Sequence, residues 1–153
     1  MSPRRVAEQH LLEMLGERLC EYFPAKVIDH PGIWVSCVFQ QLREAIANGD
    51  KVAVSIACDL IEHDPHLPFG KLIKSGLSRE LRRHTDLLLS SERRQIIDAT
   101  AKLLSLEFAP RELEDYARLV ARLPRNEFAA RIGTVTTQSE KASRLKEQLL
   151  GER

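Results

Sequence analysis

The sequence is short of the residues that interrupt regular structure. Its 153 residues include only 7 glycines and 7 prolines, and β-branched residues rarely cluster. Nowhere do apolar and polar residues alternate strictly enough to indicate a β-sheet. Leucine, alanine, arginine and glutamate are abundant instead, and these residues favour helix. We therefore expect an all-α protein.

Long apolar runs, one-sided charge and paired cysteines are also missing. No apolar stretch approaches the roughly 18 residues that span a bilayer, and polar residues follow Arg4 and Arg5 where a signal peptide would be apolar. The formal net charge of +1 gives no simple argument for a nucleic-acid or membrane partner. Cys20, Cys37 and Cys58 form no CxxC pair and have apolar neighbours, which favours reduced core cysteines. We expect a cytoplasmic protein.

Motifs of common catalytic sites are absent from the sequence. There is no GxSxG elbow, no HExxH, and no cysteine beside a histidine. The segment PFGK at 68–71 lacks the GxxxxGK[ST] spacing of a phosphate-binding loop. We therefore expect no cofactor and no enzymatic activity.

A weak metal-binding pattern leaves one enzymatic alternative open. Asp59 and His63 are four residues apart on a predicted helix, and His66 follows in the next loop. Three such ligands within eight residues are able to hold a divalent ion. Pro65 fixes a turn between the two histidines, however, and no second histidine-rich segment exists. A metal-dependent enzyme is the less favoured hypothesis.

Apolar periodicity predicts seven or eight helices, which form antiparallel hairpins where the linkers are short. The predicted helices cover about 3–22, 33–48, 51–62, 70–84, 91–108, 110–123, 127–132 and 138–150. The hairpins 33–62, 70–108 and 110–132 follow one another at spacings roughly like those of 40-residue α-α repeats. Two architectures fit, an irregular bundle and a short α-α superhelix of the HEAT type.

The last helix is predicted to be an accessory element. Residues 1–133 form a single helical domain in this interpretation, and 134–153 form a linker and a C-terminal helix. The apolar stripe of that helix is narrow, comprising Ala142, Leu145 and Leu149. Such a helix is expected to fray or to pack on a second copy of the chain, which makes a homo-oligomer possible.

Positive charge is concentrated in the helix predicted over 70–84. Between positions 71 and 94 there are seven lysines and arginines and three acidic residues. At about 100° per residue the cations share one half of the helix with Ser75 and Ser78, while Leu72, Leu77 and Leu81 occupy the other half. This pattern indicates either a solvated helix face or a patch that recognises anions.

Several carboxylates have a position that needs explanation. Glu80 falls inside the apolar arc of the basic helix, so it requires a partner such as His84 or an arginine of another helix. We interpret this as a structural ion pair rather than a catalytic acid. Glu112, Glu114 and Asp115 follow Pro110 at a helix start, where they complement the helix dipole.

These observations favour a non-enzymatic helical binding or adaptor protein that contacts an anionic macromolecular partner, most simply a protein. The predicted contact residues are Phe69, Lys71, Lys74, Arg79, Arg82 and Arg83. A nucleic-acid-binding protein is the alternative, with 70–84 and 91–108 as a helix-turn-helix. The intervening segment TDLLLSS is longer than the usual three- or four-residue turn of that motif.

Overall fold

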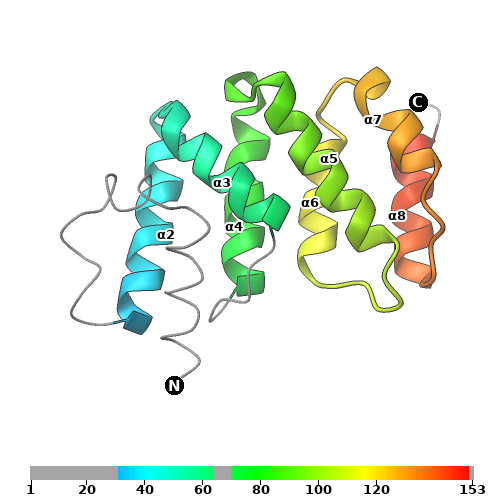
Figure 1. The fold of residues 1–153 in the computed structure, drawn as a ribbon, viewed down its shortest axis with the longest axis horizontal. Coiled ribbons are helices and arrows are strands. Elements are labelled where there is room, and N and C mark those ends of the chain that lie inside the picture. Colours follow the sequence, from blue (N-terminus) through cyan, green and yellow to red (C-terminus); the bar gives the residue numbers. More distant parts are fainter. Residues whose placement is uncertain (1–30, 64–69, 152–153) are drawn as a thin grey trace.

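The chain is helical throughout the part that the structure describes. The computed structural model describes residues 31–63 and 70–151, with the side chains of 39–63 and 73–151. These ranges contain seven α-helices, a short 3-10 helix η1 (Thr85–Leu87) and no strand, which confirms the all-α class (Figure 1). The helices are α2 (Pro31–Ala47), α3 (Lys51–His63), α4 (Gly70–Arg83), α5 (Ser90–Leu104), α6 (Glu112–Val120), α7 (Arg125–Gly133) and α8 (Glu140–Leu150). The helix predicted over 3–22 lies outside the described residues.

The helices form two layers that follow the long axis of the molecule. In one layer α2 packs on α4, α4 on α6 and α6 on α8, and in the other α3 packs on α5 and α5 on α7 (Figure 1). The hairpin of α2 and α3 packs as expected. By contrast, α4 packs chiefly on α2 and α6 rather than on α5, so the hairpin predicted over 70–108 is not a packing unit. A HEAT-type superhelix stays a prediction.

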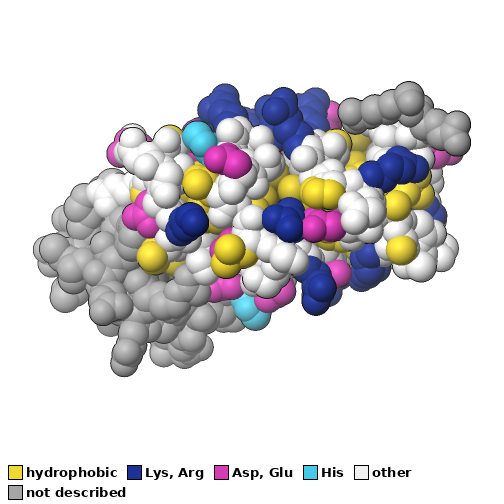
Figure 2. All heavy atoms as spheres, turned by 90° about the horizontal axis from the view of Figure 1, so that it is seen from above, with side chains coloured by type: hydrophobic (Ala, Val, Ile, Leu, Met, Phe, Trp, Pro, Cys, Tyr) yellow, Lys and Arg dark blue, Asp and Glu magenta, His cyan; other side chains and the backbone are white. Residues whose placement is uncertain are grey.

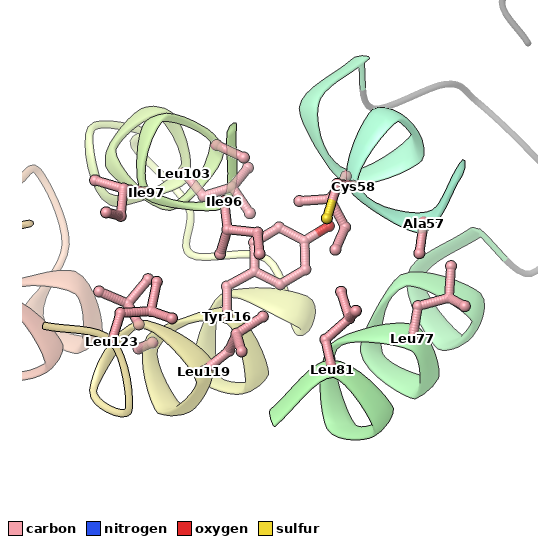
Figure 3. Packing of buried hydrophobic residues seen from close by; sticks show 14 of the residues in the cluster. Ala57, Cys58, Leu77, Leu81, Ile96, Ile97, Leu103, Tyr116, Leu119 and Leu123 are labelled. Atoms are coloured by element: carbon pink, nitrogen blue, oxygen red, sulfur yellow. The ribbon is translucent and has the colours of Figure 1, made fainter. Parts of the chain in front are cut away.

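A single apolar core joins the two layers. Tyr116 of α6 lies among side chains from α3, α4 and α5, and its hydroxyl points toward Cys58 (Figure 3). Burial raises the pKa of the Cys58 thiol well above its ordinary value, so this cysteine is a protonated core residue as predicted. The largest fully buried side chains are Tyr116, Leu42, Ile46, Ile56, Leu60, Ile61, Leu77, Leu81, Ile96 and Leu104.

The turn between α2 and α3 is built by local chemistry. Gly49 has a φ of +85°, a conformation that glycine adopts without steric cost, and it follows the end of α2. The Asp50 carboxylate then accepts hydrogen bonds from the backbone N–H groups of Val52 at 2.9 Å and Ala53 at 3.3 Å. Asp50 is therefore the N-cap of α3 (Lys51–His63).

The helix predicted to reach Phe108 is shorter than expected. α5 ends at Leu104, and the Ser105 hydroxyl donates a hydrogen bond to the Lys102 carbonyl at 2.7 Å. Phe108 is 83% exposed rather than inward-facing. Pro110 disfavours helical geometry only at Ala109, so it accounts for a break before α6 but not for the end of α5 at Leu104.

The apolar stripe of α8 faces the rest of the protein. Ala142, Leu145 and Leu149 are buried in the main core, and α8 packs on α7, α6 and α5. The Ser139 hydroxyl accepts a hydrogen bond from the Ala142 N–H at 3.1 Å and caps the helix. The Arg125 guanidinium donates to the backbone carbonyls at the other end of α8. Within the described residues, no helix combines the length and the apolar character needed to cross a membrane.

Candidate functional site: the arginines of α4 and α6

α4 buries more of its polar side than the sequence pattern predicts. Leu77 and Leu81 face the core as expected, but Lys74, Ser75 and Ser78 are buried too. The Ser78 hydroxyl donates to the Lys74 carbonyl at 2.8 Å, so its polar group is satisfied within the helix. The predicted division into an apolar half and an open basic half is therefore wrong for these positions, because α4 lies between α2 and α6.

Lys74 is buried beside a carboxylate of α6. Its Nζ lies 3.7 Å from Glu112 Oε2, and the two side chains are only 9% and 5% exposed. An ammonium with so little contact with water is unable to act as a freely accessible contact for a large partner. Lys74 therefore belongs to the α4–α6 interface, where the opposite charge of Glu112 offsets part of the cost of its desolvation.

Arg79 forms the second connection between these helices. Its Nε donates to Asp115 Oδ1 at 3.2 Å and its Nη2 donates to Asp115 Oδ2 at 3.4 Å. This two-point contact fixes the plane of the guanidinium group. Glu112 and Asp115 do lie in the first turn of α6, where they complement the helix dipole as predicted. Their ion pairs with α4 were not predicted.

Glu80 has the partners that the sequence pattern required. Its carboxylate lies 3.8 Å from Arg43 of α2, 3.5 Å from Arg83 and 3.9 Å from His84. Gly76 lies beside this cluster, and a Cβ at that position would meet the Arg43 guanidinium at 3.4 Å. The interpretation of Glu80 as a member of a structural ion pair is confirmed.

In these ion pairs the positive groups lie at the protein surface and the negative groups are buried beneath them. The side chains of Arg79 and Arg83 are 51% and 63% exposed, while those of their partners Asp115 and Glu80 are 8% and 12% exposed. The carboxylates thus lie beneath the guanidinium groups that they hold. A guanidinium group carries five N–H donors. When one or two of these N–H groups bond the buried carboxylate, the other N–H groups stay available to a ligand.

α6 adds arginines that the sequence analysis did not single out. Arg118 bonds Glu114 at 3.0 Å on the exposed side of α6, and Lys141 of α8 approaches the same carboxylate at 3.8 Å. Arg122 follows the end of α6 and is exposed. Figure 2 shows Lys and Arg side chains gathered along one edge of the molecule. The signal in the sequence was the four-residue spacing of the two arginines, but nothing in it places α6 beside α4.

The side chains of two of the six predicted contact residues fall outside what the structure describes. Phe69 lies in the segment 64–69, and only the backbone of Lys71 is described. Arg82 is partly exposed, and it forms no ion pair with any residue in the described ranges. The structure thus brings Lys74, Arg79, Arg82 and Arg83 onto one helix as predicted, but it gives Lys74 and Arg79 structural partners on α6.

The residues considered as metal ligands have other contacts. The Gln95 amide of α5 donates to Asp59 at 2.8 Å, and His63 Nε2 lies 3.4 Å from Glu62. His66 lies outside the described residues. Within the ranges 31–63 and 70–151, no three histidine, cysteine or acidic side chains are grouped to hold a metal ion.

No protein-family model, curated protein or solved structure matches this chain. The function is therefore inferred from the arrangement of the protein's own side chains. Exposed guanidinium groups above buried carboxylates are suited to bind anions, and the thiol of Cys58 is buried and protonated, which makes it a poor nucleophile.

Proposed function

We propose that this chain is a non-enzymatic helical binding protein, located in the cytoplasm, that contacts an anionic macromolecular partner through α4. The proposal rests on the exposed guanidinium groups of Arg79 and Arg83, which lie above the buried carboxylates of Asp115 and Glu80. It gives the surface a positive character although the whole chain has a formal charge of only +1. A protein partner fits this balanced overall charge better than a nucleic acid does.

The contact residues differ in their expected roles. Arg82 and Arg83 present their charge to the partner, and Arg79 does so while it is held by Asp115. Lys74 supports the site from inside the α4–α6 interface. Phe69 and Lys71 stay predicted contacts on the basis of sequence. The helix-turn-helix hypothesis loses support, because α4 and α5 belong to different layers and do not pack chiefly on each other.

A pull-down from the native cell tests this proposal. The bait proteins are the wild type, the variant Arg82→Glu/Arg83→Glu, and the control Arg94→Glu/Arg144→Glu, which reverses two exposed arginines on α5 and α8. Each is incubated with lysate before and after nuclease treatment. We expect partners that survive nuclease and are lost only with the α4 variant.

Two results would contradict the proposal. Capture of the same proteins by all three baits would show that the α4 arginines are only a solvated surface. Loss of all captured material after nuclease treatment would favour the nucleic-acid alternative. The melting temperature of each bait is measured first, so that an unfolded variant is not mistaken for one that has lost its contact.

A further inference from the structure

Two arginines beside the α4–α6 interface lack an ion-pair partner among the residues that the structure describes. They are Arg82 near the end of α4 and Arg122 just after α6, and neither forms an ion pair within the ranges that the structure describes. Their neighbours Arg79, Arg83 and Arg118 are paired, but the carboxylates that pair with Arg83 and Arg118 are also approached by other cations. Positive charge is therefore in excess at this end of the interface.

Helix geometry places these two arginines on facing sides of the interface. Lys74, Ser78 and Arg82 recur every four residues, and Lys74 contacts Glu112 of α6, so Arg82 continues the stripe that faces α6. Arg122 lies in the turn directly after α6, seven residues beyond Asp115, which contacts Arg79 of α4. Its backbone N–H donates to the Leu119 carbonyl at 3.0 Å, so the chain still winds as a tight helical turn there. A seven-residue step is about two turns, so Arg122 continues the stripe that faces α4.

The rise along each helix axis gives the length of this group of arginines. The bonds between Arg79 and Asp115 fix the two helices side by side, and α4 and α6 point the same way in Figure 1. Arg82 lies three residues beyond Arg79, a rise of about 4.5 Å, and Arg122 lies seven residues beyond Asp115, a rise of about 10 Å. Arg79, Arg82 and Arg122 together thus span about two helical turns along the interface.

On this basis we propose that α4 and α6 together form a docking site for an acidic helical segment of a partner protein. This inference rests on the proposed function, and it adds α6 to the site and names the kind of partner. Carboxylates at positions i, i+4 and i+7 of a helix span about 10 Å, which matches the length of the arginine patch. Guanidinium groups also bind carboxylates in a two-point geometry.

The charges around the patch favour a peptide over a nucleic acid. Glu114 is half-exposed at its edge, where it pairs with Arg118 and Lys141. This carboxylate repels a continuous phosphate backbone, but it accepts a lysine or arginine next to the acidic residues of a protein segment. A patch of about two turns is also short for a nucleic-acid backbone, which gains affinity from many phosphate contacts in a row.

The test is a titration with a defined probe. A labelled, helix-stabilised peptide with glutamates at i, i+4 and i+7 is added to the full chain, and its fluorescence anisotropy is followed at low and moderate salt. Arg82→Glu changes α4 only and Arg122→Glu changes α6 only. Arg144→Glu is the matched control, because it reverses an exposed arginine on α8 that has no ion pair with any residue of 31–63 or 70–151. Reference probes are the same peptide with glutamine in place of glutamate, and a DNA duplex of similar charge.

We expect each of the two variants to weaken peptide binding about tenfold and the control to change it less than about twofold. Weakening by Arg82→Glu but not by Arg122→Glu would overturn the extension to α6 and leave the proposed function intact. No effect of either variant would overturn both. Binding of the duplex more tightly than the peptide, with the same response to the variants, would overturn the assignment of a protein partner.

Discussion

At the scale of single residues, burial decides what each charged side chain contributes. Lys74 and Arg79 occupy the same helix and carry the same charge, yet the side chain of Lys74 is 9% exposed and that of Arg79 is 51% exposed. A helical projection of the sequence separates cations from apolar residues on one helix only. It contains no information on which neighbour covers that helix, so the burial of Lys74 was not predictable.

The pair of Lys74 and Glu112 is expected to matter for stability. Lys74→Met leaves a buried carboxylate without this cation, which should lower the free energy of unfolding by about 3–5 kcal/mol. The double variant Lys74→Met/Glu112→Leu should regain much of that loss, because neither charge of this pair is then left buried without the other. Urea denaturation measures both. Arg118→Met is the control, since it breaks an exposed ion pair that is worth about 1 kcal/mol or less. A loss as small as that of the control would show that water reaches Lys74.

The contact between Arg93 and Glu127 predicts a dependence of stability on pH. Two hydrogen bonds of 2.7 and 2.9 Å from Arg93 hold the pKa of the Glu127 carboxyl below its ordinary value. A group with a lowered folded-state pKa stabilises the protein above its unfolded-state pKa, and this contribution is lost as the pH falls through the folded-state value.

Glu127→Gln should therefore reduce the urea midpoint at neutral pH, and the difference from the wild type should shrink as the pH is lowered. Glu107→Gln is the control, because it makes the same change of charge in the exposed connection between α5 and α6. A difference that stays constant down to acid pH would mean that Glu127 acts through packing rather than through its charge.

At the scale of helices, the sequence predicted which segments are helical better than it predicted where each helix ends and which helices pack together. A helix was predicted over 33–48 from apolar residues spaced four apart, and two of these, Leu42 and Ile46, are fully buried in α2. The end of α5 was placed four residues too late, because Phe108 continues the apolar spacing although the chain has already turned toward Pro110. The sequence indicated that Glu80 needs an ion-pair partner, because it interrupts an apolar arc. Glu112 and Asp115 gave no such indication, because their position at a helix start already explains why they are acidic.

α2 is expected to be essential for folding. Leu42→Asp places an unpaired carboxylate at a position with no exposure, which is strongly disfavoured, so this variant should not fold. Gln40→Asp introduces the same group on the exposed side of the same helix and serves as the control. Circular dichroism and thermal melting compare the two. A cooperative transition for Leu42→Asp near that of the control would exclude α2 from the core. The apolar spacing of the sequence predicts the same outcome for Cys37→Asp, whose side chain lies outside the described residues.

Removal of α8 tests its predicted accessory role. An accessory helix would leave the melting of residues 1–133 nearly unchanged. Leu145 and Leu149 are buried in the main core, however, and burial of a leucine side chain contributes about 1.5–3 kcal/mol. We therefore expect truncation after Gly133 to lower the melting temperature clearly and at every protein concentration. An unchanged melting temperature at every protein concentration would support the accessory role, and a loss seen only at high protein concentration would indicate that α8 packs on a second copy.

At the scale of the whole molecule, the layers could not be derived from the sequence. Short linkers indicate only that consecutive helices point in opposite directions, and they do not say which helices pack together. α4 and α6 are about 30 residues apart in the chain, yet they share the ion pairs of Lys74 and Arg79. The candidate site depends on this pairing, so the sequence predicted its α4 half and missed its α6 half.

The layered arrangement predicts an order of local stability. α5 packs on α3, α6, α7 and α8, and α4 and α6 each have a neighbour on both sides in their own layer. α8 is the last helix of its layer and has one such neighbour, α6. Opening of α8 therefore exposes less buried surface than opening of α4, α5 or α6, and segments that open at lower cost exchange their amide hydrogens faster.

Hydrogen exchange followed by mass spectrometry should show the slowest exchange in α4, α5 and α6 and faster exchange in α8. Arg125→Gln, which removes the hydrogen bonds to the carbonyls at the end of α8, should speed exchange in α8 without changing it in α4. Equal protection of α4 and α8, lost together in the variant, would instead mean that the chain unfolds only as a single unit.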